Sequence, residues 1–128
     1  MSKKILLIED HREIRHLTAK CLRHLGYDLV EAEDGQLGVR MALAEKPDLV
    51  LLDLSLPVVS GFEVARKMKE NLKTSRIPII GCSAWLGQEI VTRSLKAEMV
   101  EYVSKPCSTK KIESVIKRHI GPAVSARL

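Results

Sequence analysis

Acidic, hydroxyl and amine side chains follow apolar runs of the sequence, and their types suit chemistry on phosphate. Glu9 and Asp10 follow the run ILLI, Asp53 follows LVLL, Ser83 follows IIGC and Lys105 follows YVS. Three carboxylates at one place would repel each other, and a divalent cation such as Mg²⁺, which prefers oxygen ligands, would remove that repulsion. We therefore predict that Glu9, Asp10 and Asp53 bind Mg²⁺, if the fold brings them together.

Asp53 is the candidate nucleophile of this set. A carboxylate can attack phosphorus and form an acyl phosphate, whose charge a metal, a lysine and a hydroxyl can share. Lys105 and Ser83 supply the lysine and the hydroxyl. The backbone carbonyl of Ser55, two residues after Asp53, would add a neutral metal ligand. The set predicts phosphoryl transfer to Asp53.

These side chains meet only if the apolar runs are strands of one parallel sheet. Strands are expected at residues 4–9, 27–32, 49–52, 77–82 and 100–103, and helices at 12–25, 35–45, 62–71, 85–96 and 108–119. Five strand–helix repeats predict an α/β fold, a doubly wound five-stranded parallel sheet with helices on both faces. In such sheets ligands bind beyond the carboxyl ends of the strands, where the candidate residues fall.

The first expected helix illustrates how the core is assigned. Ile14, Leu17 and Leu22 recur at helical spacing and predict the buried stripe, and Gly26 predicts the helix end. After the last helix we expect the domain, residues 1–121, to give way to a short tail at 122–128.

Composition limits the classes of function. The chain has 128 residues, of which 45% are hydrophobic and 29% charged, as is typical of one globular domain. No apolar run is long enough to cross a membrane, and the N-terminal run is too short for a signal peptide, so a cytoplasmic location is expected. Three scattered cysteines predict neither disulfides nor a zinc site. The net charge of +5 is spread along the chain, which makes nucleic-acid binding through residues 110–118 an unfavoured alternative.

Four stretches together resemble the receiver domain of two-component response regulators, the CheY-like family. They are ILLIEDH, PDLVLLDLSLPVVSG, PIIGCSA and YVSKP, and the resemblance extends from residue 3 to about residue 119. It implies the flavodoxin-like strand order 2-1-3-4-5. It also implies that Asp53 accepts a phosphoryl group from a histidine kinase or a histidine phosphotransfer protein, with Mg²⁺ as cofactor.

The resemblance also assigns roles to the remaining residues. Ser83 would bond a phosphoryl oxygen, Lys105 would pair with the phosphoryl group, and Tyr102 would turn inward with it. Lys105 and Pro106 would be joined by a cis bond. Residues at the positions of Ser55 and Trp85 tune the phosphate lifetime in the family. Because neither offers a carboxylate or an amide to orient water, we expect slow self-dephosphorylation.

The signal is expected to leave through the face made by residues 85–119. No output domain follows the last helix, so a stand-alone response regulator that contacts an unknown protein target is expected, and a homodimer is compatible with this reading. The protein would be a signalling phosphoacceptor and not an enzyme. Glu98 departs from the family pattern, because glycine is usual there, and the end of the fourth helix is expected to lack a left-handed glycine cap.

Two other readings compete with this one. A haloacid-dehalogenase-type phosphatase also uses an aspartate nucleophile with Mg²⁺, but it would need a second aspartate where this chain has Ser55. A degenerate receiver that binds partners independently of phosphate is the main alternative.

Overall fold

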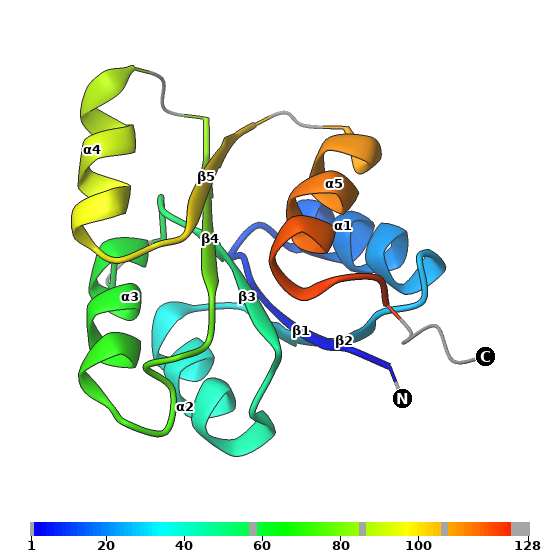
Figure 1. Cartoon of the computed structure of the whole chain (residues 1–128), viewed down its shortest axis with the longest axis horizontal. Helices are drawn as coiled ribbons and strands as arrows, with labels where there is room; N and C mark the ends of the chain where they lie inside the picture. The colour runs from blue at the N-terminus through cyan, green and yellow to red at the C-terminus, as the bar shows by residue number, and fades with distance from the viewer. Residues whose placement is uncertain (1, 57–58, 85–86, 106–107, 124–128) are drawn as a thin grey trace.

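The chain folds into one sheet of five parallel strands between two layers of helices (Figure 1). The structure is a computed structural model that describes residues 2–56, 59–84, 87–105 and 108–123. The strands are β1 (Lys4–Ile8), β2 (Asp28–Ala32), β3 (Leu49–Asp53), β4 (Ile79–Ser83) and β5 (Glu101–Ser104). The helices are α1 (Arg12–His24), α2 (Gly35–Glu45), α3 (Gly61–Glu70), α4 (Gln88–Lys96) and α5 (Thr109–Ile120).

The strand order is β2-β1-β3-β4-β5, and every pair is parallel. This confirms the predicted doubly wound sheet. The predicted strands 3 and 4 end one residue too early, because Asp53 and Ser83 are still paired in the sheet as the last residues of β3 and β4. The two side chains are therefore held by strand hydrogen bonding and not by a loop.

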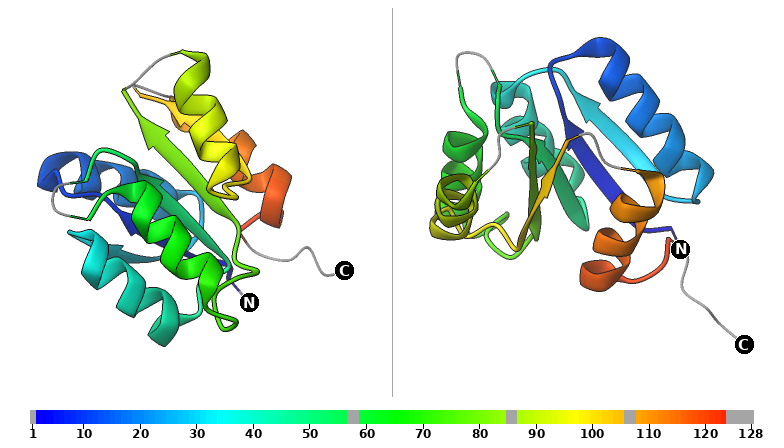
Figure 2. Two further views of the ribbon diagram at one scale, coloured as in Figure 1. Left: turned by 90° about the vertical axis from the view of Figure 1, so that its left-hand side faces the viewer. Right: turned by 90° about the horizontal axis from the view of Figure 1, so that it is seen from above.

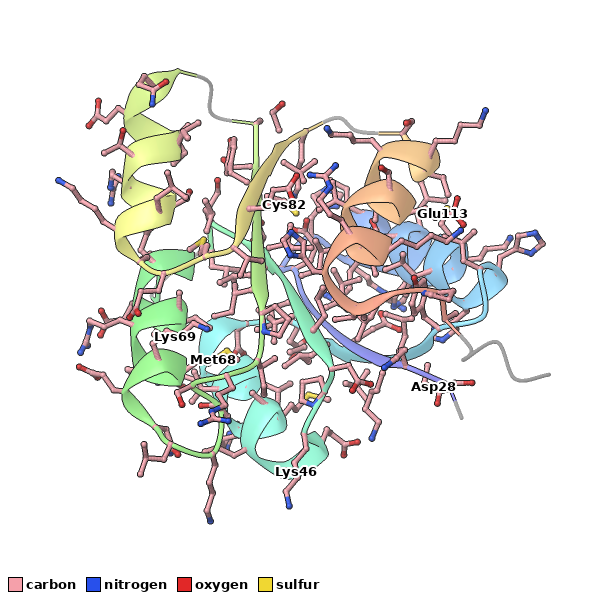
Figure 3. All side chains as sticks on the ribbon, in the orientation of Figure 1. Asp28, Lys46, Met68, Lys69, Cys82 and Glu113 are labelled. Atoms are coloured by element: carbon pink, nitrogen blue, oxygen red, sulfur yellow. The ribbon has the colours of Figure 1, made fainter. Side chains whose placement is uncertain are left out.

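Helices cover both faces of the sheet (Figure 2), and a cluster of buried hydrophobic side chains fills the space on each face. Leu6 and Ile8 of β1 pack with α2, α3 and α4, whereas Ile5 and Leu7 pack with α1 and α5. Met68, labelled in Figure 3, belongs to the cluster on the face covered by α2, α3 and α4. Cys82, also labelled there, belongs to the cluster on the face covered by α1 and α5. Side chains alternate between faces along a strand, so a sheet covered on both sides needs the continuous apolar runs seen in the sequence.

The predicted buried stripe of α1 is wrong for two residues. Ile14 and Leu17 are 41% and 65% exposed, whereas Arg15, Ala19 and Leu22 are buried. The helix is turned so that the Arg15 guanidinium donates to the backbone carbonyl of Glu9, and this buried hydrogen bond lets a charged residue occupy the inner face.

The two helix ends for which glycine was considered both have left-handed backbone. Gly26 follows α1 with φ +101°, as predicted. Glu98 follows α4 with φ +61°, so this helix ends in a left-handed residue even though the glycine usual in the family is missing. The amide of Glu98 donates to Leu95 and that of Met99 to Ser94, which is the hydrogen-bond pattern of a Schellman cap.

The end of the described chain packs against the sheet. Ala123, which falls within the tail expected from the sequence, is buried among the residues that contact α1 and α5. Its carbonyl accepts a hydrogen bond of 2.7 Å from the amide of Lys3. The packed part of the domain therefore reaches at least Ala123.

Within the described part of the chain, none of the helices combines the length and apolar character that crossing a membrane requires.

Candidate functional site

The candidate residues lie at the carboxyl end of the sheet. Glu9 and Asp10 directly follow β1, Asp53 ends β3, Ser83 ends β4 and Lys105 directly follows β5. The parallel register sets Asp53 opposite Cys82 and Ser83 opposite Ser104, so these strand ends are level with each other.

Three carboxylates of this edge form a cluster that could hold a metal ion. Oxygens of Glu9, Asp10 and Asp53 all lie within 4.8 Å of one another. Glu9 and Asp53 are 3% and 6% exposed, whereas Asp10 faces solvent. Carboxylate oxygens are the ligands that hard divalent cations prefer, so the donor set fits Mg²⁺ or a similar ion.

Lys105 supplies a positive charge beside this cluster. Its ammonium pairs with Oε1 of Glu9 and lies 3.8 Å from Oδ2 of Asp53. Burial acts to lower the pKa of Lys105, but the hydrogen bond to Glu9 and the charges of Asp53 and Glu9 outweigh it and raise the pKa. The amine is therefore a fixed cation at neutral pH.

The surroundings of Asp53 shift the pKa of its carboxyl group in opposite directions. Burial raises its pKa, the backbone amide of Ser55 opposes this by donating to Oδ1 at 2.9 Å, and the neighbouring Glu9 raises the pKa further. Lys105 acts in the other direction, yet the net shift is upward. A bound cation would favour the charged form that attack on phosphorus requires.

The hydroxyl of Ser83 is buried next to Ser55, which follows β3. Its Oγ lies 3.2 Å from Oγ of Ser55, within hydrogen-bond distance. The backbone carbonyl of Ser83 accepts hydrogen bonds from the Tyr102 hydroxyl at 3.1 Å and from the Lys105 amide at 2.8 Å. Three residues with predicted roles are thus joined through Ser83.

Some predictions concern parts that the structure does not describe. Trp85 and Pro106, and with the latter the predicted cis bond, lie outside the described residues. The predicted metal-binding role of the Ser55 carbonyl stays a prediction.

Sequence reasoning missed Arg15. Its guanidinium Nη1 donates to the backbone carbonyl of Glu9 at 3.0 Å. In the sequence, an arginine within a helical stretch that also contains Arg12 and Glu13 is typical of a solvated face, so no local signal marks it as buried.

A cavity of about 270 Å³ opens beside the site on the α1 and α5 side of the sheet. Its walls are mostly apolar and include the exposed Ile14 and Leu17, and Glu9, Asp53 and Lys105 also line it. The cavity therefore gives the charged cluster an apolar border.

The whole domain matches a known family. Residues 5–117 match the family described as response regulator receiver domain. The chain belongs to this family. It is 35% identical over 128 residues to the phosphate regulon transcriptional regulatory protein PhoB of Pseudomonas aeruginosa, covering 98% of this chain and 56% of PhoB. It is 29% identical to the polar-differentiation response regulator DivK of Brucella anthropi, covering 96% of this chain and all (100%) of DivK. The chain thus spans about half of PhoB and the full length of DivK.

Solved structures agree with this membership. The receiver domain of a sensor histidine kinase from Pseudomonas aeruginosa, which holds a magnesium ion in its active-site cleft, has a TM-score of 0.87 and 31% identity, covering 94% of this chain and 99% of that one. The chemotaxis protein CheY4 of Vibrio cholerae has a TM-score of 0.89 at 21% identity, covering 93% and 99%. The second likeness confirms the CheY-like fold.

Proposed function

We propose that this receiver domain accepts a phosphoryl group on Asp53 from a histidine kinase or a histidine phosphotransfer protein. One observation carries the proposal. The buried Asp53 carboxylate shares the carboxyl edge of the sheet with two further carboxylates and with the Lys105 ammonium, 3.8 Å away. Membership of the receiver family supports this role.

Mg²⁺ is the cofactor that the site would take. Glu9, Asp10 and Asp53 would hold it with their side chains and Ser55 with its backbone carbonyl. The oxygen donor set supports this choice, as does the magnesium ion in the cleft of the related kinase receiver domain. When bound, the ion would neutralise charge on the carboxylates and on the transferred phosphoryl group.

The phosphoryl transfer needs one nucleophile and several groups that stabilise charge. An oxygen of Asp53 attacks the phosphorus of a phosphohistidine, the phosphorus–nitrogen bond breaks, and the electron pair leaves with the donor imidazole. Lys105 pairs with a phosphoryl oxygen, and the hydroxyl of Ser83 donates to another. The product is an aspartyl phosphate, so the domain acts as a signalling phosphoacceptor and not as a catalyst for a separate substrate.

The phosphorylated site would change the surface formed by α4, β5 and α5. Ser83 would leave Ser55 to reach the phosphoryl group, and Tyr102 would follow because its hydroxyl is bonded to the Ser83 carbonyl. Leu95 and Val100 expose apolar side chains on this surface. We infer that a downstream protein binds there and that this contact transmits the signal.

Acetyl phosphate and Mg²⁺ test the proposal. Intact-mass spectrometry should show the gain of one phosphoryl group, which chelation of Mg²⁺ prevents and which Asp53→Asn abolishes. Asp28→Asn is the matched control, because Asp28 is an exposed aspartate of β2. Phosphorylation that persists in Asp53→Asn would contradict the assignment. A wild-type protein that gains no phosphoryl group but still binds its partner would favour the degenerate receiver instead.

A further inference from the structure

A buried positive charge lies close to the acidic cluster without contacting the reacting group. Among the residues that the structure describes, Arg15 is the one buried basic residue, with 9% of its surface exposed. Burying a charge is costly unless it is paired and hydrogen-bonded. The partners of Arg15 therefore indicate what the arrangement achieves.

Arg15 connects the loop that carries two predicted cation ligands to the edge of the sheet. Nη1 donates to the backbone carbonyl of Glu9 at 3.0 Å, and Nε lies 3.5 Å from Oε1 of Glu31 on β2. The amide of Arg15 also donates to the carbonyl of His11 at 2.8 Å. Arg23 bonds the other oxygen of Glu31 at 3.1 Å from the solvent side.

These bonds hold the backbone on both sides of Asp10. The carbonyl of Glu9 and the amide of Asp10 belong to one planar peptide unit, so a bond to the carbonyl sets the orientation of that plane. On the other side of Asp10, the amide of His11 donates to Oε2 of Glu9 at 3.2 Å. The carbonyl of His11 accepts from the backbone amide of Arg15. The backbone that carries the exposed Asp10 is therefore held at the residue before it and at the residue after it.

We propose that Arg15 is a positioning residue that presets Glu9 and Asp10 for the divalent cation, and that Glu31 in turn holds the guanidinium in place. The inference rests on the proposed function, because it assumes that these carboxylates bind the ion. Residues that hold metal ligands from outside typically change metal affinity by about 10- to 100-fold when they are removed. A merely structural role, tying α1 to β2, would change stability but not cation affinity.

Calorimetric titration of the metal-free protein with Mg²⁺ tests the inference. Arg15→Met keeps a long apolar side chain and removes the donors, and it should raise the Mg²⁺ dissociation constant by about 10- to 100-fold. At saturating Mg²⁺ its maximal rate of phosphorylation by acetyl phosphate should stay close to wild type, because the ligands themselves are intact. Arg15→Lys retains one donor group and should give an intermediate affinity.

Arg23→Met is the matched control. It removes the outer partner of Glu31 while Arg15 and its bond to Glu9 remain, so Mg²⁺ affinity should be unchanged. A folded Arg15→Met that binds Mg²⁺ as tightly as wild type would overturn the inference, as would an Arg23→Met that weakens binding equally. If Arg15→Met does not fold, Arg15→Lys is measured in its place, and a Mg²⁺ affinity equal to that of wild type would overturn the inference.

A second measurement is independent of the metal. In the metal-free Arg15→Lys protein, the backbone amide of Asp10 should shift in the nuclear magnetic resonance spectrum more than in Arg23→Met. An unmoved Asp10 signal would overturn the inference. Failure of the wild-type protein to bind Mg²⁺ would instead remove the cation site of the proposed function, and the inference with it.

Discussion

The pKa of Asp53 is shifted in opposite directions by the groups around its carboxylate. Burial and Glu9 raise its pKa, whereas the Ser55 amide and Lys105 lower it. The pKa of Asp53 is higher in the folded protein than in the unfolded chain. The charged carboxylate therefore destabilises the metal-free fold at neutral pH. A cation bound by these carboxylates would offset this cost, because it would favour the charged form of Asp53.

We expect Asp53→Asn to stabilise the metal-free protein at neutral pH. The sign follows from linkage: a carboxyl whose pKa is raised on folding opposes folding at every pH above its folded pKa, and this penalty disappears below the unfolded pKa. Urea unfolding should therefore show a higher midpoint for Asp53→Asn at pH 7 and no difference in strong acid. Equal midpoints at pH 7 would show that Lys105 already compensates the charge.

The bond between Ser55 and Ser83 leads to a second prediction at this scale. In the proposed mechanism Ser83 leaves Ser55 to bind a phosphoryl oxygen, so Ser55→Ala should favour the occupied state. Losing one net hydrogen bond of about 1 kcal/mol should tighten binding of the phosphoryl mimic beryllofluoride about fivefold. Binding can be followed by nuclear magnetic resonance in the presence of Mg²⁺.

A double-mutant cycle checks the cause of this effect. In a Ser83→Ala background, Ser55→Ala should no longer change beryllofluoride affinity, because the bond is already absent. A gain of the same size in both backgrounds would mean that Ser55 acts on the phosphoryl site directly.

Helix ends and strand–helix contacts decide the geometry of the surface that includes α4, β5 and α5. Glu98 adopts the left-handed conformation that glycine adopts without strain, and Glu101 of β5 joins α5. Both features lie within or next to the elements that are proposed to transmit the signal. They can be tested separately from the phosphoryl chemistry.

Glu98→Gly should stabilise the protein by about 1 kcal/mol, because a side chain in the left-handed region costs about 1–2 kcal/mol and glycine recovers part of it. Urea unfolding at neutral pH measures the change. Glu98→Ala is the control: it keeps the strained backbone but removes the carboxylate, whose charge partly opposes the burial that lowers the pKa of Lys69. Stabilisation by alanine equal to that by glycine would assign the effect to charge.

Glu101 joins β5 to α5 through three hydrogen bonds. Its oxygens accept from Arg118 at 2.9 and 2.7 Å, and one of them lies 2.8 Å from Nε2 of His119. Burial acts to raise the pKa of Glu101, but His119 and Arg118 outweigh it and lower the pKa. The ion cluster therefore stabilises the fold above the unfolded pKa, and this contribution is lost as the pH falls through the folded pKa.

Glu101→Gln should accordingly destabilise the protein at pH 7 and have little effect in strong acid. Unfolding by urea at several pH values measures this difference. A destabilisation that is the same at every pH would indicate lost packing and not lost charge.

At the scale of the whole molecule, the parallel sheet could be predicted because strands and helices alternate along the chain, and the candidate site could be placed because its residues follow or end the strands. Glu9, Asp53 and Lys105 follow or end apolar runs, and parallel strands bring such positions to one edge. The family resemblance added the strand order. This level of organisation follows from the order of elements and needs no knowledge of side-chain packing.

Other features could not be predicted because they depend on tertiary contacts. The buried face of α1 is determined by the bond between Arg15 and Glu9, which a helical repeat of apolar residues does not reveal. The left-handed conformation of Glu98 could not be predicted, because the sequence shows only that the usual glycine is missing and not that Met99, the next residue, is buried. The pairing of Ser55 with Ser83 likewise depends on side-chain positions from two strands.

Binding of a cation at the acidic cluster should stabilise the entire domain, because its ligands come from the ends of β1 and β3 and exist together only in the folded state. A ligand at about 100 times its dissociation constant adds about 2.7 kcal/mol. Thermal unfolding should therefore shift upward with Mg²⁺, and Asp10→Asn should reduce the shift while Asp28→Asn retains it. An equal shift in Asp10→Asn would mean that the ions act on the general surface charge, and the carboxylates at the carboxyl edge of the sheet would then not form the cation site.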